Sequence, residues 1–185
     1  MESEEKTARR QEALHFLNER TNYETFRVIP YQEMAAGFDR FRKTARSLEL
    51  LTPPFPIIHV AGTKGKGSVA LMLERILREE GLVTGLFTSP HLEKVEERFA
   101  INGQPVDSDD FTDGILELKK CLDGTSCANT IYNPTYNSAC SIETTCENSA
   151  NPSPPRRDWT FFEISVLLAL LLFRIKGFEA AILET

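Results

Sequence analysis

A turn rich in glycine and lysine at residues 62–68, with the sequence Gly-Thr-Lys-Gly-Lys-Gly-Ser, is the feature that most constrains the fold. The mostly apolar run 57–61 precedes it and predicts a buried strand, and the apolar residues of 68–80 recur at helical spacing. A strand, a glycine-rich turn and a helix in this order gather backbone N–H groups and the positive end of a helix dipole around one point. The turn therefore predicts an α/β fold with an anion-binding loop.

This anion-binding loop is the candidate site for the phosphates of ATP. Its spacing departs from the common phosphate loop, because Gly67 stands between Lys66 and Ser68. The alternative is a solvated surface turn, but the strand and helix on either side favour a phosphate loop. The candidate ATP-binding residues are Gly62, Thr63, Lys64, Gly65, Lys66, Gly67 and Ser68.

Further motifs follow the loop in a distinctive order. They are Gly-Leu-Phe-Thr-Ser-Pro-His-Leu at 85–92, Glu-Arg at 97–98, Ile-Asn-Gly-Gln-Pro-Val at 101–106 and Thr-Phe-Phe-Glu at 160–163. Together with the loop, these motifs resemble the folylpolyglutamate synthase family, which is part of the Mur ligase group of ATP-dependent amide ligases. The resemblance covers most of residues 7–122 and resumes over 159–184.

The resemblance implies an enzyme that uses ATP and Mg²⁺ to activate the γ-carboxylate of a folate as an acyl phosphate. The amino group of L-glutamate would then displace the phosphate and give a longer γ-glutamyl folate. The dihydrofolate synthase reaction, which joins glutamate to dihydropteroate, stays open beside it. A Mur ligase of cell-wall synthesis is a third possibility, although the motifs at 89–92 and 160–163 favour the folate branch.

The same resemblance implies roles for individual residues. Lys66 is expected to be catalytic, as the charge on the β- and γ-phosphates, and Glu163 to be both catalytic and a magnesium ligand. Ser89 and Ser68 are the other expected magnesium ligands, and oxygen donors suit that ion. Taken alone, Ser89 also fits a turn opener and Glu163 a partner of a helix dipole. The expected substrate-binding residues are His91 and Arg98.

Composition narrows the class of protein. The net charge of −6 and the scattered Lys and Arg residues argue against nucleic-acid binding. The apolar stretch 164–173 is shorter than the ~20 residues that cross a bilayer, and residues 1–12 lack the apolar core of a signal peptide, so we expect a cytoplasmic protein without membrane contact. The cysteines lack the spacing of zinc ligands and are expected to be free thiols; they are Cys121, Cys127, Cys140 and Cys146.

The chain is expected to form one partial N-terminal ATP-binding domain over 1–185, with a mostly parallel sheet, flanking helices and the truncated architecture of a P-loop-like Mur ligase central domain. Its parts are a helical segment at 7–54, a phosphate-loop core at 55–122, a flexible insertion at 123–158, and a core helix with the start of a strand at 159–185. Asn102-Gly103 predicts a hairpin, and Ser108 the cap of the next helix.

The family's C-terminal glutamate-ligase domain has no counterpart in this sequence. We therefore expect the chain to be inactive alone, and a non-catalytic truncated ATP-binding module is the alternative to a ligase. The final strand is expected to leave an open sheet edge, which favours association with other chains.

Overall fold

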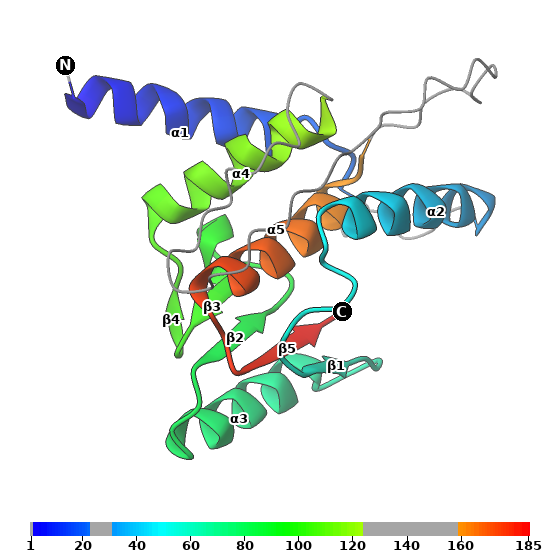
Figure 1. Cartoon of the computed structure of the whole chain (residues 1–185), viewed down its shortest axis with the longest axis vertical. Coiled ribbons are helices and arrows are strands. Elements are labelled where there is room, and N and C mark those ends of the chain that lie inside the picture. The colour runs from blue at the N-terminus through cyan, green and yellow to red at the C-terminus, as the bar shows by residue number, and fades with distance from the viewer. Residues whose placement is uncertain (1, 23–30, 124–158) are drawn as a thin grey trace.

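The computed structural model describes residues 2–22, 31–123 and 159–185. The described residues form one five-stranded sheet with helices on both faces, which confirms the α/β class (Figure 1). The strands lie in the order β1 (Ile57–Val60), β5 (Ala180–Glu184), β2 (Thr84–Phe87), β3 (Phe99–Ile101) and β4 (Gln104–Pro105). The insertion predicted at 123–158 falls, from residue 124 onward, outside the described residues.

The sheet has a parallel part of three strands and an antiparallel part at one side. β1, β5 and β2 are parallel, whereas β3 is antiparallel to β2 and β4 is antiparallel to β3. The predicted hairpin at Asn102 and Gly103, whose φ angles of 47° and 73° suit a tight turn, joins β3 to β4. The last strand is also not at an edge: β5 lies between β1 and β2, so β1 is the exposed parallel edge.

Side chains alternate between the two faces of the central strand β5. Ala181 and Leu183 belong to the larger apolar cluster, while Ile182 belongs to a smaller one with Ala70 and Leu86. The smaller cluster lies under α3 (Lys66–Glu79), and α4 (Ser108–Leu122) and α5 (Phe161–Lys176) cover the opposite face (Figure 1). The core is therefore two layers of side chains separated by one sheet.

Helix α5 is the centre of the larger layer. It begins at a capping box formed by Thr160 and Glu163 and ends at Gly177, whose φ is 71°. Its buried residues lie on all sides because it packs between β2 and the helices α1 and α4. These residues are Phe161, Ile164, Ser165, Leu167, Leu168, Ala169, Leu170, Leu171, Leu172 and Phe173.

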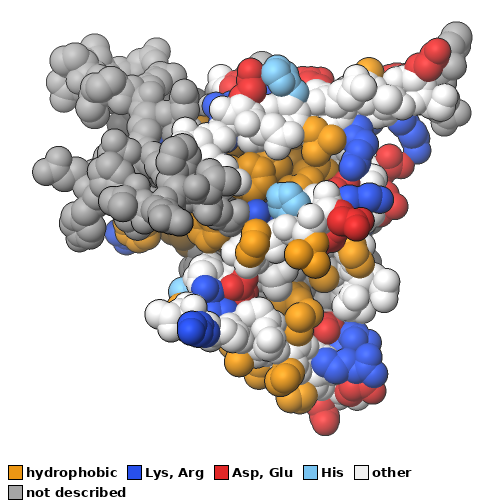
Figure 2. Space-filling model, turned by 180° about the vertical axis from the view of Figure 1, so that it is seen from behind, with side chains coloured by type: hydrophobic (Ala, Val, Ile, Leu, Met, Phe, Trp, Pro, Cys, Tyr) orange, Lys and Arg blue, Asp and Glu red, His pale blue; other side chains and the backbone are white. Residues whose placement is uncertain are grey.

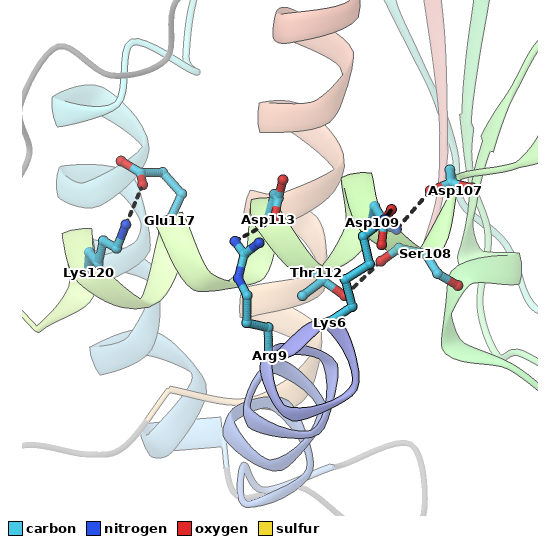
Figure 3. Close-up of polar contacts among 9 residues, drawn as sticks. All are labelled: Lys6, Arg9, Asp107, Ser108, Asp109, Thr112, Asp113, Glu117 and Lys120. Carbon is cyan, nitrogen blue, oxygen red and sulfur yellow. Dashed lines mark hydrogen bonds and ion pairs between the residues drawn. The ribbon is translucent and has the colours of Figure 1, made fainter. Parts of the chain in front are cut away.

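The N-terminal helix α1 (Glu2–Asn18) lies along α4, and its buried residues include Phe16 and Leu17. Ion pairs join the two helices: Lys6 with Asp109 at 2.8 Å and Arg9 with Asp113 at 2.7 Å (Figure 3), and Glu12 with Lys119 at 2.6 Å. The partners advance together along both sequences, so α1 and α4 run in the same direction. A second helix, α2 (Tyr31–Ser47), buries Ala45.

Helix boundaries differ in places from the sequence expectation. Asp107, rather than Ser108, caps α4, because its side chain accepts a hydrogen bond from the N–H of Asp109 at 2.8 Å. A short 3₁₀ helix, η2 (Val95–Arg98), joins the turn after β2 to β3. These segments bring the motifs at 85–92 and 97–98 next to the carboxyl ends of the parallel strands.

Candidate functional site

The glycine-rich loop joins the carboxyl end of the edge strand β1 to the start of α3. Gly65 is the cap of α3 with a left-handed φ of 75°, and no side chain caps the helix. The first N–H groups of α3 thus have no side-chain acceptor and remain available to an anion. Gly62, Thr63 and Lys64 are exposed, so the loop is open to solvent.

A buried carboxylate lies beside this loop. Glu184, the last residue of β5, is 3% exposed, and its Oε1 lies 3.7 Å from Nζ of Lys66. The backbone N–H of Ser89 donates to Oε2 of Glu184 at 2.7 Å, and the Ser89 hydroxyl lies 3.5 Å from the same oxygen. A lysine, a carboxylate and a serine from three elements therefore meet at one point.

The sheet order explains why these three residues meet. β5 lies between β1 and β2, so the carboxyl ends of all three parallel strands share one edge of the sheet. Ligands of open α/β sheets bind at this edge. Sequence reasoning placed Glu184 at the end of a buried strand but gave it no role. An acidic residue that ends an otherwise apolar strand was the available signal.

Glu163, predicted as a metal ligand, makes its hydrogen bonds at the start of α5. Its Oε2 accepts hydrogen bonds from the N–H of Thr160 at 2.8 Å and from the Thr160 hydroxyl at 2.9 Å. Arg40 also donates to this oxygen at 3.3 Å, and the Arg40 guanidinium stacks on Trp159 with Cζ 4.1 Å from the ring centroid. Through Oε2 the carboxylate thus stabilises the first turn of α5, beside the loop of His91, whose ring lies 6.4 Å from that of Phe161.

The structure brings the other two candidates, His91 and Arg98, together. Arg98 Nε donates to Nδ1 of His91 at 2.8 Å, and the Arg98 guanidinium lies over the Phe161 ring with Cζ 4.9 Å from its centroid. Arg98 is 1% exposed, whereas His91 is half-buried. His91 follows Ser89 by two residues, so this pair lies next to the Lys66, Glu184 and Ser89 cluster.

The oxygen donors at the cluster fit a hard divalent cation, because carboxylate and hydroxyl oxygens are the ligands that Mg²⁺ prefers. Over 2–22, 31–123 and 159–185, no group of three or more His, Cys, Asp or Glu residues is arranged to hold a metal. A cation here would share its coordination with water and phosphate oxygens, as Mg²⁺ commonly does. Ser68, on the exposed first turn of α3, is accessible to the same ligand.

None of the helices in the described part of the chain combines the length and the apolar character needed to cross a bilayer.

Comparisons with known proteins identify related sequences and folds. A scan against protein-family models finds no match. The chain is 49% identical over 80 residues to the mitochondrial folylpolyglutamate synthase of Homo sapiens, an alignment that covers 43% of this chain and 14% of that protein. The chain thus spans about one seventh of the length of this curated relative.

Solved structures share the fold. FolC of E. coli, in complex with DHPP and ADP, aligns with a TM-score of 0.57 and 28% identity over 78% of this chain and 27% of that chain. A bifunctional folylpolyglutamate synthase/dihydrofolate synthase with Mn, AMPPNP and L-glutamate bound aligns with a TM-score of 0.57 and 29% identity, covering 80% of this chain and 29% of that one. Sequence and fold together relate this chain to the folylpolyglutamate synthase family, over a part of the length of its members.

Proposed function

We propose that this chain is the ATP-binding part of a folylpolyglutamate synthase-type ligase. The meeting of Lys66, Ser89 and the buried Glu184 beside an uncapped helix N-terminus carries the proposal. An ammonium group, helix N–H groups and oxygen donors for a metal are what a bound triphosphate and its Mg²⁺ require. The relatives with ADP and with AMPPNP and Mn bound support this chemistry.

Each residue of the cluster then has a distinct role. Lys66 and the N–H groups of residues 62–68 bind the phosphates, and Ser68 and Ser89 supply oxygens to the cation or to the phosphate. Glu184 supplies the carboxylate, and its burial keeps this charge from being screened by water. Glu163 as a magnesium ligand stays a prediction; its Oε2 is hydrogen-bonded at the start of α5.

The substrates of the whole protein follow from its relatives. We infer that a folate, or a pteroate precursor, supplies the carboxylate and that L-glutamate supplies the amino group, because relatives are solved with DHPP and with L-glutamate. Folylpolyglutamate synthase and dihydrofolate synthase activity both stay open. In this proposal the bound metal and the groups around the phosphates activate the substrate carboxylate by holding it in position and by stabilising the charge that develops.

The proposed parts of this chain are a helical segment at 7–54, a phosphate-loop core at 55–122, an insertion at 123–158 and a core helix and strand at 159–185. We propose that the remaining length of the relatives supplies the glutamate site, so the 185-residue chain binds ATP but does not ligate. The non-catalytic ATP-binding module is the second candidate. We place the protein in the cytoplasm, whereas the human relative is named mitochondrial.

Titration of the 185-residue chain with ATP, with and without Mg²⁺, tests the nucleotide site. We expect Lys66→Ala to weaken ATP binding roughly tenfold or more, since it removes a charge that contacts phosphate. The exposed Lys64→Ala is the matched control and is expected to change the affinity by less than about threefold, as exposed charges contribute little. Equal effects of the two substitutions, or no binding by the unsubstituted chain, would refute the nucleotide site.

An assay with folate, L-glutamate and ATP tests the second part of the proposal. We expect no γ-glutamyl product from the chain alone, because the site that holds the amine is outside it. Product formed by the purified chain would show that its 185 residues are sufficient for ligation.

A further inference from the structure

We infer that Arg98 is a positioning residue, which holds the loop after β2 in place from inside the protein and does not itself bind substrate. Arg98 is the largest of the fully buried side chains, with 1% of it exposed. A guanidinium with this burial is out of reach of a ligand in solution. Its contacts inside the protein, rather than contacts with substrate, therefore explain why a permanently charged group is buried at this place.

Arg98 is hydrogen-bonded to both ends of the segment 88–91. Its backbone oxygen accepts a hydrogen bond from the N–H of Thr88 at 3.0 Å. Its side-chain Nε donates to Nδ1 of His91 at 2.8 Å. Ser89 lies between these two attachment points, so one residue fixes the loop on both sides of the serine.

An aromatic ring completes the environment of the arginine. The Arg98 guanidinium lies over Phe161, with Cζ 4.9 Å from the ring centroid, and Phe161 is 4% exposed. The ring of His91 lies 6.4 Å from that of Phe161, centroid to centroid. A cation over an aromatic face is stabilised most when water is excluded. Arg98 thus links the loop to the first residue of α5, in the middle of the core.

The loop position matters because Ser89 contacts the buried carboxylate. The N–H of Ser89 donates to Glu184 at 2.7 Å, and Glu184 in turn lies 3.7 Å from Lys66. A shift of the loop would move the N–H and the hydroxyl of Ser89 away from Glu184. This step rests on the proposed function, in which Ser89 and Glu184 hold the divalent cation.

The Ser89 N–H reports the position of the loop in the free protein. It is hydrogen-bonded to Glu184, and an amide held in this way exchanges its hydrogen with solvent slowly. The N–H of Thr88 is bonded to the backbone oxygen of Arg98 and keeps this acceptor when the arginine side chain is replaced. The exchange of these two amides is independent of any nucleotide.

Two measurements on the ¹⁵N-labelled 185-residue chain test the inference. Amide hydrogen exchange reports whether the Ser89 N–H keeps its bond to Glu184. We expect this amide to exchange slowly in the native chain and at least roughly tenfold faster in Arg98→Leu, with the Thr88 amide changed much less. ADP titrations should show Arg98→Leu lowering the Mg²⁺-dependent gain in affinity roughly tenfold, with the metal-free affinity changed by less than about twofold.

The matched control is Arg174→Leu, which removes an arginine away from the site whose side chain donates to the Leu48 carbonyl and to Glu49. We expect this control to leave both the exchange of the Ser89 amide and the Mg²⁺ dependence unchanged. If Arg98→Leu does not fold, His91→Asn keeps an acceptor for Arg98 and should retain the Mg²⁺ dependence, whereas His91→Phe should lose it.

Several results would overturn the inference. One is a Ser89 amide that exchanges fast in the native chain, or whose exchange is unchanged by Arg98→Leu. Another is an equal loss of ADP affinity with and without Mg²⁺, which would make Arg98 a nucleotide contact. A native chain that binds no ADP would refute the proposed function, while the exchange of the Ser89 amide would still decide the role of Arg98.

Discussion

At the scale of single residues, the two glycines Gly85 and Gly67 have opposite environments. A Cβ on Gly85 in β2 would lie 2.7 Å from Cδ1 of Phe173, a fully buried ring of α5. A Cβ on Gly67 in the first turn of α3 meets nothing within 4 Å. Gly85 therefore allows α5 to pack closely on the sheet, whereas the position of Gly67 has room for a side chain.

These two glycines give a paired stability prediction. We expect Gly85→Ala to lower the free energy of unfolding by about 1–3 kcal/mol, because the added methyl group would overlap the buried ring of Phe173. Gly67→Ala should leave it unchanged or raise it by up to about 1 kcal/mol, since alanine favours helices. Urea unfolding of both variants measures the difference. A Gly85→Ala protein as stable as Gly67→Ala would contradict the close packing.

The residues that could be predicted from the sequence are those whose signal is local. The glycine-rich loop and the Asn102-Gly103 turn are short motifs with their own backbone requirements, and both lie where they were expected. Glu184 was given no role, because its meaning depends on β5 pairing with both β1 and β2. Such pairings join residues far apart in the chain, and no local pattern encodes them.

At the scale of elements, α1 is attached to the rest of the fold by charge as well as by apolar contact. Besides its ion pairs with α4, Arg10 of α1 pairs with Glu96 of η2, and Glu96 is 4% exposed. Burial raises the pKa of the Glu96 carboxyl group. Hydrogen bonds from Arg10, from its own backbone N–H and from Ser108, together with the Arg10 charge, have the larger combined effect, so the pKa is lowered from its ordinary value of 4.5. The Arg10–Glu96 contact is therefore stabilising only while Glu96 is ionised.

This attachment predicts an acid-sensitive stability. A carboxyl whose pKa is lower in the folded chain than in the unfolded chain stabilises the fold above about pH 4.5. That stability is lost as the pH falls from there through the lowered pKa. We expect Glu96→Gln to cost about 1–3 kcal/mol at pH 7 and to flatten the loss of stability between pH 5 and pH 3.

Urea midpoints measured across this pH range check the prediction. The control is Asp109→Asn, which breaks the exposed pair with Lys6 and should cost much less at pH 7. An unchanged slope in Glu96→Gln would show that other carboxyl groups cause the acid sensitivity.

The type of each helix or strand was easier to predict from the sequence than its first and last residues. The order of helices and strands from residue 57 onward agrees with the hydrophobic pattern, whereas α1 starts at Glu2, before the start of the helical segment predicted at 7. The segment 2–6 is polar on every side and has no apolar period to reveal a helix. Its ion pair from Lys6 to Asp109 depends on α4, which lies a hundred residues away.

At the scale of the whole molecule, the outer face of α3 is apolar. Val69 is 49% exposed, Leu71 56%, Met72 65% and Ile76 58%. Figure 2 shows hydrophobic side chains at the lower end of the molecule, where Figure 1 places α3. The exposed edge strand β1 lies on the same side of the fold as the start of α3. A surface of this kind is typical of an interaction face.

This surface predicts self-association of the 185-residue chain. We expect the weight-average mass in sedimentation velocity to rise with concentration, and the double substitution Met72→Lys and Ile76→Lys to suppress that rise. Phe38→Lys, at an exposed residue of α2, is the control that should leave the association unchanged. A chain that stays monomeric at high concentration would contradict the prediction.

The Lys66–Glu184 contact also has a thermodynamic consequence. In the resting protein the lysine charge is already balanced by a buried carboxylate. A bare triphosphate would meet that carboxylate and be repelled by it, whereas a divalent cation that arrives with the nucleotide restores neutrality. Metal and nucleotide are then linked ligands: each raises the affinity for the other by the same factor, so either one, titrated against the other, measures a single coupling free energy.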